Sequence, residues 1–277
     1  MNIRPIILSL LSPLHPLRLI IFNNKTLINL GQQINKKKLA KIRYSDDSQR
    51  GNFVICVCPM EVENKDLLME GARSLGVYLD GKAIESFELY LKELLKWNQK
   101  INLTSIRSEK GIVLKHFLDS LSICPYLPEQ SSILDIGSGA GFPGIPLKIV
   151  RPSLEITLID SVRKKIDFQR HLIRVLGLKG IEAIHGRVQD KGILQCLGGR
   201  FDVTLSRAFS DLQTLLALSH PFLKERGTVL AMKGELDLGE IRHLAEIEGN
   251  RYRLQKTISL ILPFSSFKRT LLLFQKR

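Results

Sequence analysis

The sequence predicts an α/β fold, with a mostly parallel sheet, an antiparallel hairpin at its C-terminal end and a helical cap before it. After residue 127, short apolar runs alternate with helix-length amphipathic segments, which is typical of parallel strands joined by crossover helices. The last two apolar runs have no helix-length segment between them, so they should pair antiparallel. Between residues 61 and 126 the apolar positions follow a helical period instead.

These patterns divide the chain into a basic extension at 1–60, a helical cap at 61–126 and an α/β domain at 127–277. The extension holds nine basic and two acidic side chains, and prolines interrupt its apolar opening. Three interpretations are open for this extension. It is a cleaved signal peptide, it is an organellar transit peptide, or the start codon has been placed too far upstream and Met60 or Met69 is the real initiator. We favour the last interpretation, because regular amphipathic patterning begins only after Met60.

The cap contains two helical patterns. Ile84, Phe87 and Leu91 recur at spacings that place apolar side chains on one helix face. A second helix is expected over 112–123, and Pro125 stops it shortly after that range.

In the α/β domain the predicted elements follow one another at short intervals. In chain order they are a strand at Ser132–Ile136, a helix from 143, a strand at Glu155–Asp160, a helix at 162–176, strands at Ile181–His185 and Phe201–Ser206, a helix at 211–223, a strand at 228–233, a helix at 238–247, and hairpin strands at 257–262 and 270–275.

A glycine-rich loop follows the first strand of this domain. Gly137, Gly139 and Gly141 let the backbone turn sharply and approach a ligand, and the helix after them offers free N–H groups. This arrangement suits a nucleoside-type cofactor at the carboxyl end of the sheet. Residues 139–144 also fit G-x-G-x-x-G, so a nicotinamide-dependent oxidoreductase is one alternative.

Two acidic residues bear on that choice. Asp135, two residues before the first glycine, would repel a pyrophosphate but complement the ammonium and sulfonium groups of S-adenosylmethionine. Asp160, at the end of the second strand, suits the ribose hydroxyls of either cofactor. Methyl transfer is therefore the better fit, and the predicted fold is a Rossmann-like S-adenosylmethionine-dependent methyltransferase.

A series of motifs in fixed order resembles the RsmG (GidB) family of ribosomal RNA methyltransferases. The motifs are Trp97-Asn98, residues 102–105 (Asn-Leu-Thr-Ser), 116–120 (His-Phe-Leu-Asp-Ser), 135–146, 158–161, Arg187-Val188, 206–209 (Ser-Arg-Ala-Phe) and 232–234 (Met-Lys-Gly). The resemblance runs from about Leu89 to Gly234, and more loosely through the hairpin.

The resemblance implies methyl transfer from S-adenosylmethionine to guanine N7 in the decoding-site (530) loop of bacterial 16S rRNA. The partner that it implies is 16S rRNA or the small ribosomal subunit. We expect a monomer in the cytoplasm, or in an organelle only if residues 1–60 are a genuine transit peptide. No membrane is expected, because no apolar run reaches the roughly 18 residues needed to span a bilayer, and no metal, because the four cysteines form no zinc-binding pattern. The cofactor positions that the resemblance carries over are Gly137, Phe142, Val188, Gln189 and Arg207. Asp160 joins them because of its place at the end of the second strand.

Guanine N7 has a lone pair and no proton that must leave, so alignment of the reactants is sufficient and no general base is required. The segment 206–209 agrees, because it has neither an (Asp/Asn)-Pro-Pro-aromatic element nor a nucleophilic cysteine. We assign no catalytic acid or base, and expect Arg207 to position the reactants, since Arg pairs with guanine edges. His116 and Asp119, three residues apart, are expected to form a supporting hydrogen-bonded pair.

The whole net charge of +14 lies at the two ends of the chain, with +7 in residues 1–60 and +7 in 251–277. RNA contacts are expected from the basic C-terminal segment, through Arg269. They are also expected from a locally basic helix after Asp160, through Arg163, Lys164 and Lys165. Two further alternatives stay open: a class I methyltransferase with another RNA or protein substrate, and a non-catalytic RNA-binding assembly factor.

Overall fold

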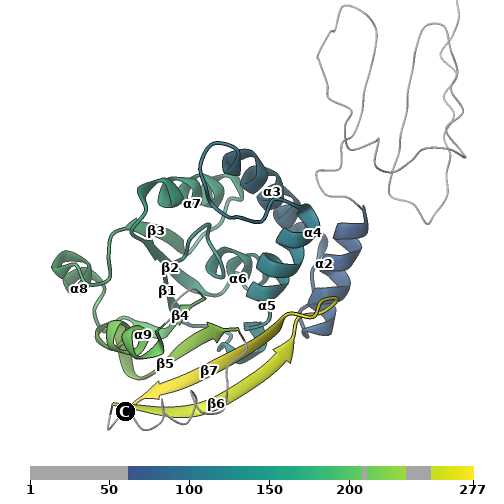
Figure 1. Cartoon of the computed structure of the whole chain (residues 1–277). Coiled ribbons are helices and arrows are strands. Elements are labelled where there is room, and N and C mark those ends of the chain that lie inside the picture. The colour runs from purple at the N-terminus through teal and green to yellow at the C-terminus, as the bar shows by residue number, and fades with distance from the viewer. Residues whose placement is uncertain (1–61, 208–210, 235–250) are drawn as a thin grey trace, which may run out of the picture. The chain divides into compact units, whose positions relative to one another are not determined.

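A computed structural model describes residues 62–207, 211–234 and 251–277 (Figure 1). The extension at 1–60 and the helix expected over 238–247 lie outside the described residues. Pro59–Arg277 form one compact unit. In the described part of the chain, no helix is both long and apolar enough to span a bilayer.

A seven-stranded sheet, in the order β3-β2-β1-β4-β5-β7-β6, forms the centre of this unit. Strands β1 to β5 are parallel, whereas β7 is antiparallel to both β5 and β6. The strands are β1 Ser132–Ile136, β2 Glu155–Asp160, β3 Ile181–His185, β4 Phe201–Ser206, β5 Leu223–Lys233, β6 Tyr252–Ile261 and β7 Lys268–Lys276. The predicted Rossmann-like sheet with its antiparallel C-terminal hairpin is confirmed.

The connections between the parallel strands are helical. They contain α6 Gly144–Val150, α7 Arg163–Val175, α8 Lys191–Leu197 and α9 Leu212–Ser219. The helix predicted over 211–223 is shorter, because its last part forms a 3-10 turn, His220–Phe222, and then β5. The short helix α8 is absent from the sequence prediction, and it buries only Leu197.

Strand β5 begins earlier than predicted, at Leu223 rather than 228. Its register with β4 shifts between the pairs Phe201↔Leu223 and Val203↔Thr228, so the early part of β5 is irregular. Lys224, Glu225 and Arg226 in that part are exposed, so they give no apolar alternation for a sequence pattern to detect.

The region before β1 is helical, with α2 Val62–Ser74, α3 Gly81–Asn98, α4 Glu109–Ile112, a π-helix Val113–Leu118, α5 Asp119–Leu121 and a 3-10 turn Cys124–Tyr126. Asp80 caps α3 by accepting a 2.7 Å hydrogen bond from the backbone N–H of Ala83. The helix predicted over 112–123 differs in two ways from the structure. The helical segment begins at Glu109, and it contains the π-helix Val113–Leu118, which a 3.6-residue pattern does not reveal.

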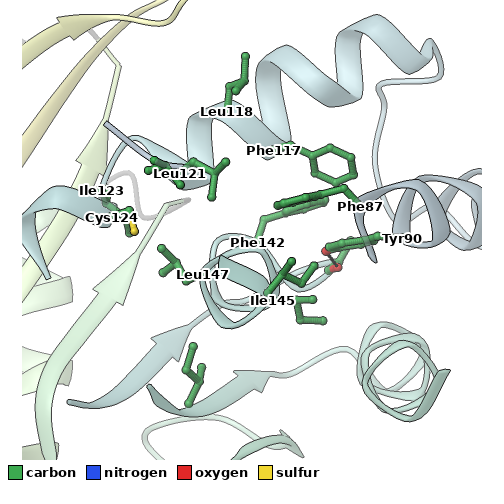
Figure 2. Packing of buried hydrophobic residues seen from close by; sticks show 14 of the residues in the cluster. Phe87, Tyr90, Phe117, Leu118, Leu121, Ile123, Cys124, Phe142, Ile145 and Leu147 are labelled. Carbon is green, nitrogen blue, oxygen red and sulfur yellow. Dashed lines mark hydrogen bonds between the residues drawn. The ribbon is translucent and has the colours of Figure 1, made fainter. Parts of the chain in front are cut away.

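These helices pack against the glycine loop through aromatic side chains (Figure 2). The ring centroids of Phe87 and Phe117 are 4.9 Å apart, and those of Tyr90 and Phe142 are 5.1 Å apart. One hydrophobic cluster thus contains residues from both sides of position 126. The boundary between a cap at 61–126 and a domain at 127–277 stays a prediction.

Candidate functional site

The site is built on the loop between β1 and α6. Gly137 and Gly141 have φ angles of 73° and 95°, which residues other than glycine rarely adopt. The backbone N–H groups of Gly137 and Ser138 both donate to the carbonyl of Ile159 in β2, at 2.9 and 3.1 Å. The loop is therefore attached to the end of the neighbouring strand.

Two polar side chains support this loop from the β2–α7 side. The carboxylate of Asp160 accepts from the N–H of Gly139 at 2.9 Å and from the N–H of Val162 at 2.8 Å. The amide of the buried Gln169 donates to Ser138 Oγ at 2.8 Å and to the carbonyl of Gly139 at 2.7 Å. The role of Gln169 is not among the sequence predictions; its signal is a lone polar residue on the apolar face of α7.

Phe142 joins the loop to the helical cap. Its ring stacks on Tyr90 at 5.1 Å and on His116 at 4.5 Å, and the guanidinium carbon of Arg207 is 5.2 Å from its centroid. Only 3% of Phe142 is exposed, so its ring belongs to the core beside the cleft. Tyr90, which lies next to Phe142 in Figure 2, also donates a 2.6 Å hydrogen bond to the carbonyl of Ala140.

A cleft of about 260 Å³ lies against this loop. It is lined by Gly137, Ser138, Gly139, Ala140, Phe142, Leu103, Thr104, Ser105, His116, Lys165 and Arg207. A second hollow of about 430 Å³ shares Leu103, Thr104, Ser105 and Lys165 with it, and Asn102 and Arg107 complete its lining.

The common wall of the two hollows is held by Asn98 at the end of α3. Its side-chain amide donates to the carbonyl of Thr104 at 2.9 Å, and its oxygen accepts from the N–H groups of Leu103 and Thr104 at 2.9 and 3.0 Å. These three bonds explain the structural use of the Trp97-Asn98 motif.

His116 faces the same wall. Its Nε2 lies 2.8 Å from the hydroxyl of Thr104, and its buried Nδ1 has no hydrogen-bond partner among the described residues. Burial, followed by the nearby charge of Arg207, lowers the pKa of His116 to about 3, so the ring is neutral near pH 7.

The expected side-chain pair between His116 and Asp119 is not formed. His116 lies in the π-helical segment and Asp119 directly after it, so the wider turn changes the i, i+3 geometry on which the prediction depended. Asp119 instead accepts from Arg269, with Nε to Oδ1 at 2.7 Å and Nη2 to Oδ2 at 3.3 Å. Nη1 of Arg207 is 3.6 Å from Oδ2 of the same carboxylate.

Asp135 lies beneath the loop rather than in the cleft, which differs from the expected contact with the cofactor. It is fully buried, and its Oδ2 accepts a 3.0 Å hydrogen bond from the N–H of Gly144 at the start of α6. Burial raises the pKa of Asp135 well above its usual value, and the Gly144 bond and Arg207 only partly oppose this. A carboxyl group held this way favours its neutral form and ties α6 to β1.

Of the predicted cofactor residues, Gly137, Phe142 and Arg207 line the cleft, and Asp160 bonds to its loop. Val188 is buried in a hydrophobic cluster with Leu134 and Ile136 of β1 and Ile159 of β2. Gln189 is exposed. Both follow β3, whose carboxyl end pairs with β2 through Asp160↔His185, but neither is among the residues that line the cleft. Cofactor contacts from all six positions stay predictions.

The predicted RNA contacts fall in two places. Arg163 and Lys164 are exposed at the start of α7, and Arg163 Nε is 3.2 Å from Asp167. Lys165 lines both hollows, and its Nζ is 3.8 Å from Asp160 Oδ2. Arg269 lies in the C-terminal hairpin, where it is bound to Asp119.

The residues present fit an adenosine-type cofactor. A Cβ added at Gly137 would meet no atom within 4 Å, so the loop is open to a ligand there. Asp160, at the carboxyl end of β2, lies beside the loop where an acceptor for ribose hydroxyls is needed. Within residues 62–207, 211–234 and 251–277, no group of three or more His, Cys, Asp or Glu side chains is arranged to hold a metal ion.

Comparison with known proteins gives the family. The family described as GidB, rRNA small subunit methyltransferase G, matches residues 83–265. The protein named ribosomal RNA small subunit methyltransferase G from Geobacter metallireducens is 42% identical over 221 residues, which cover 79% of this chain and 99% of that protein. The proteins of the same name from Acetivibrio thermocellus and Geobacter sp. M21 are 39% and 46% identical, and cover 78% and 73% of this chain and 90% of each relative.

Among solved structures, a SAM dependent methyltransferase from Aquifex aeolicus is similar, with 15% identity and a TM-score of 0.47 over 59% of this chain and 92% of that chain. The family match and the sequence identities place the chain: it belongs to the ribosomal RNA small subunit methyltransferase G family.

Proposed function

We propose that this chain methylates N7 of a guanine in the 530 loop of bacterial 16S rRNA, acting as a monomer in the cytoplasm. Family membership supports the coarser statement directly: the chain is an S-adenosylmethionine-dependent methyltransferase of ribosomal RNA. The position on the base and the site in the RNA are the parts that we propose.

The observation that supports methylation at guanine N7 is the set of titratable side chains that line the cleft. Among the described residues, these are His116, Lys165 and Arg207. His116, with a pKa of about 3, is too weak a base to take a proton near pH 7, and the other two are cations. An exocyclic amino group must lose a proton during methylation, whereas N7 has none to lose. The cleft therefore suits N7.

No side chain in the described cleft offers covalent catalysis. Cys124 is buried and Cys196 is exposed on α8, and neither lines the cleft. S-adenosylmethionine supplies an electrophilic methyl group on a sulfonium when it is bound. What this chain supplies is position: a rigid loop held by Asp160, Gln169 and Tyr90, and the guanidinium of Arg207 to orient a ligand.

We further propose that RNA approaches over the start of α7. Arg163 and Lys164 are exposed there, and Lys165, which follows them, lines both hollows. Phosphate groups bound by these side chains would place the target base at the cleft. Phe209, the last residue of the 206–209 motif, lies outside the described residues.

Mass analysis of 16S rRNA from cells that lack the gene tests this function. The proposal predicts loss of one 7-methylguanosine from the 530 loop and its return with the wild-type gene. Unchanged RNA together with a methylated protein would support a protein-methylating enzyme instead. Calorimetry with S-adenosylmethionine addresses the assembly-factor alternative, since absence of cofactor binding would favour a non-catalytic protein.

A further inference from the structure

Asp119 is a buried carboxylate shared by two arginines from distant parts of the chain. Only 1% of Asp119 is exposed. Arg269 of β7 binds it through two nitrogens, at 2.7 and 3.3 Å, in the bidentate geometry that a guanidinium favours. Arg207, just after β4, approaches Oδ2 at 3.6 Å. A single acidic group therefore connects the helical cap, the cleft and the C-terminal hairpin.

The charges make this carboxylate necessary for the arrangement. Two guanidinium groups near one another repel, and their side chains are only 22% and 23% exposed, so water screens them little. Without Asp119, Arg207 would lose its anionic partner in the cap and face Arg269 directly. We expect it to move toward solvent or into the cleft.

Arg207 occupies a defined place because of these contacts. Its Nη1 donates to the carbonyl of Lys115 at 3.2 Å, and its guanidinium lies 5.2 Å from the ring of Phe142. The same side chain lines the cleft with Gly137 and Gly139. A shift of the guanidinium would therefore change the shape and charge of the cleft.

The three side-chain nitrogens of Arg269 each have a hydrogen-bond partner in the chain. Nε and Nη2 bind Asp119, and Nη1 donates to the carbonyl of Lys268 at 3.0 Å. We propose that Asp119 and Arg269 are positioning residues for Arg207, so that the hairpin β6–β7 holds the cleft guanidinium in place. The inference rests on the proposed cofactor role of Arg207 and is independent of which atom of the base is methylated.

Calorimetric affinity for S-adenosylhomocysteine tests this inference without any RNA. In Arg269→Gln we expect the Kd to rise about three- to thirtyfold, and in Arg269→Lys to rise less, since Lys keeps the charge but not the bidentate geometry. Asp119→Asn should have an effect at least as large. The matched control is Arg253→Gln, which removes the same charge from an exposed position on β6 and should leave the Kd unchanged.

A double-mutant cycle separates positioning from general damage. If Arg269 acts through Arg207, then Arg269→Gln adds nothing further to the Kd of an Arg207→Gln protein. Additive effects, or an unchanged Kd in Arg269→Gln, would overturn the inference. Because Arg269 is partly exposed, that variant decides the matter even if Asp119→Asn does not fold, as checked by thermal unfolding. If Arg207→Gln itself binds normally, the cofactor role of Arg207 and this inference both fail, while the proposed reaction stands.

Discussion

The hydroxyl of Tyr90 donates a 2.6 Å hydrogen bond to the carbonyl of Ala140, in the middle of the glycine loop. Both residues are buried, and the ring of Tyr90 stacks on Phe142 two residues further along, with an angle of 7° between the planes. Helix α3 of the cap therefore fixes the loop by a hydrogen bond and by ring packing. This contact makes α3 part of the support of the candidate site.

Tyr90→Phe should destabilise the protein by about 1–3 kcal/mol, because it keeps the ring but leaves a buried carbonyl without its donor. Denaturant unfolding measures this change. Tyr78→Phe is the matched control, since Tyr78 is 86% exposed and should change stability by less than about 0.5 kcal/mol. Equal stability of the two variants would show that the Ala140 bond contributes nothing.

Gly144→Ala and Gly192→Ala should have effects of opposite sign. A Cβ at Gly144 would collide with Leu158 Cδ2 and lie 3.0 Å from Asp135 Oδ2, so we expect a loss of about 1–3 kcal/mol from overpacking. A Cβ at Gly192, in the exposed helix α8, meets nothing within 4 Å, and the better helix propensity of Ala should add up to about 1 kcal/mol. An unchanged or increased stability of Gly144→Ala would contradict the packing at α6.

His116 should make the protein less stable as the pH falls below about 6.5. Its pKa is about 3 in the folded chain and near 6.5 when unfolded, so the unfolded state binds a proton that the folded state does not. The free energy of unfolding therefore does not depend on His116 titration above pH 6.5. Between pH 6.5 and 3 it decreases as the pH falls, by about 1.4 kcal/mol per pH unit for one proton. His116→Phe should lose this part of the slope between pH 6.5 and 5; parallel stability curves for the two proteins would refute it.

Removing the charges of Arg163 and Lys164 should reduce the salt dependence of RNA binding. We expect the slope of log K against log salt concentration to flatten by up to about 0.7 for each phosphate group that the protein no longer neutralises. Lys179→Gln is the control, because Lys179 is exposed between the C-terminal end of α7 and β3, away from the start of that helix, and should leave the slope unchanged. An unchanged slope in the Arg163→Gln, Lys164→Gln protein would remove the start of α7 from the RNA-binding surface.

The sheet was largely predictable because parallel strands buried on both faces read as short apolar runs. The bounds of β1 to β4 agree with the prediction, whereas β5 begins in a charged segment that carries no such pattern. The helix predicted over 112–123 is present, but it contains the π-helical segment Val113–Leu118, which a 3.6-residue pattern does not reveal.

The site was predictable where a motif fixes the backbone, and less so where the role of a side chain depends on burial. Gly137 and Arg207 line the cleft, which leaves their cofactor role a prediction, whereas Asp135 is buried against Gly144 and Asp119 pairs with Arg269 rather than with His116. Gln169 and Tyr90 support the loop from 30 and 50 residues away in the sequence. Such long-range contacts require knowledge of how the elements pack, which spacing alone does not give.

Methylation of small ribosomal subunits in vitro, with the modified base mapped, is the decisive measurement for N7 chemistry in the 530 loop. Subunits prepared from cells that lack the gene are incubated with the purified protein and labelled S-adenosylmethionine, and the 16S rRNA is then digested and analysed by mass spectrometry. We expect one methyl group per subunit, on N7 of a guanine in the 530 loop. A methyl group on an exocyclic amine, a pyrimidine carbon or a ribosomal protein would show that the proposed reaction is wrong.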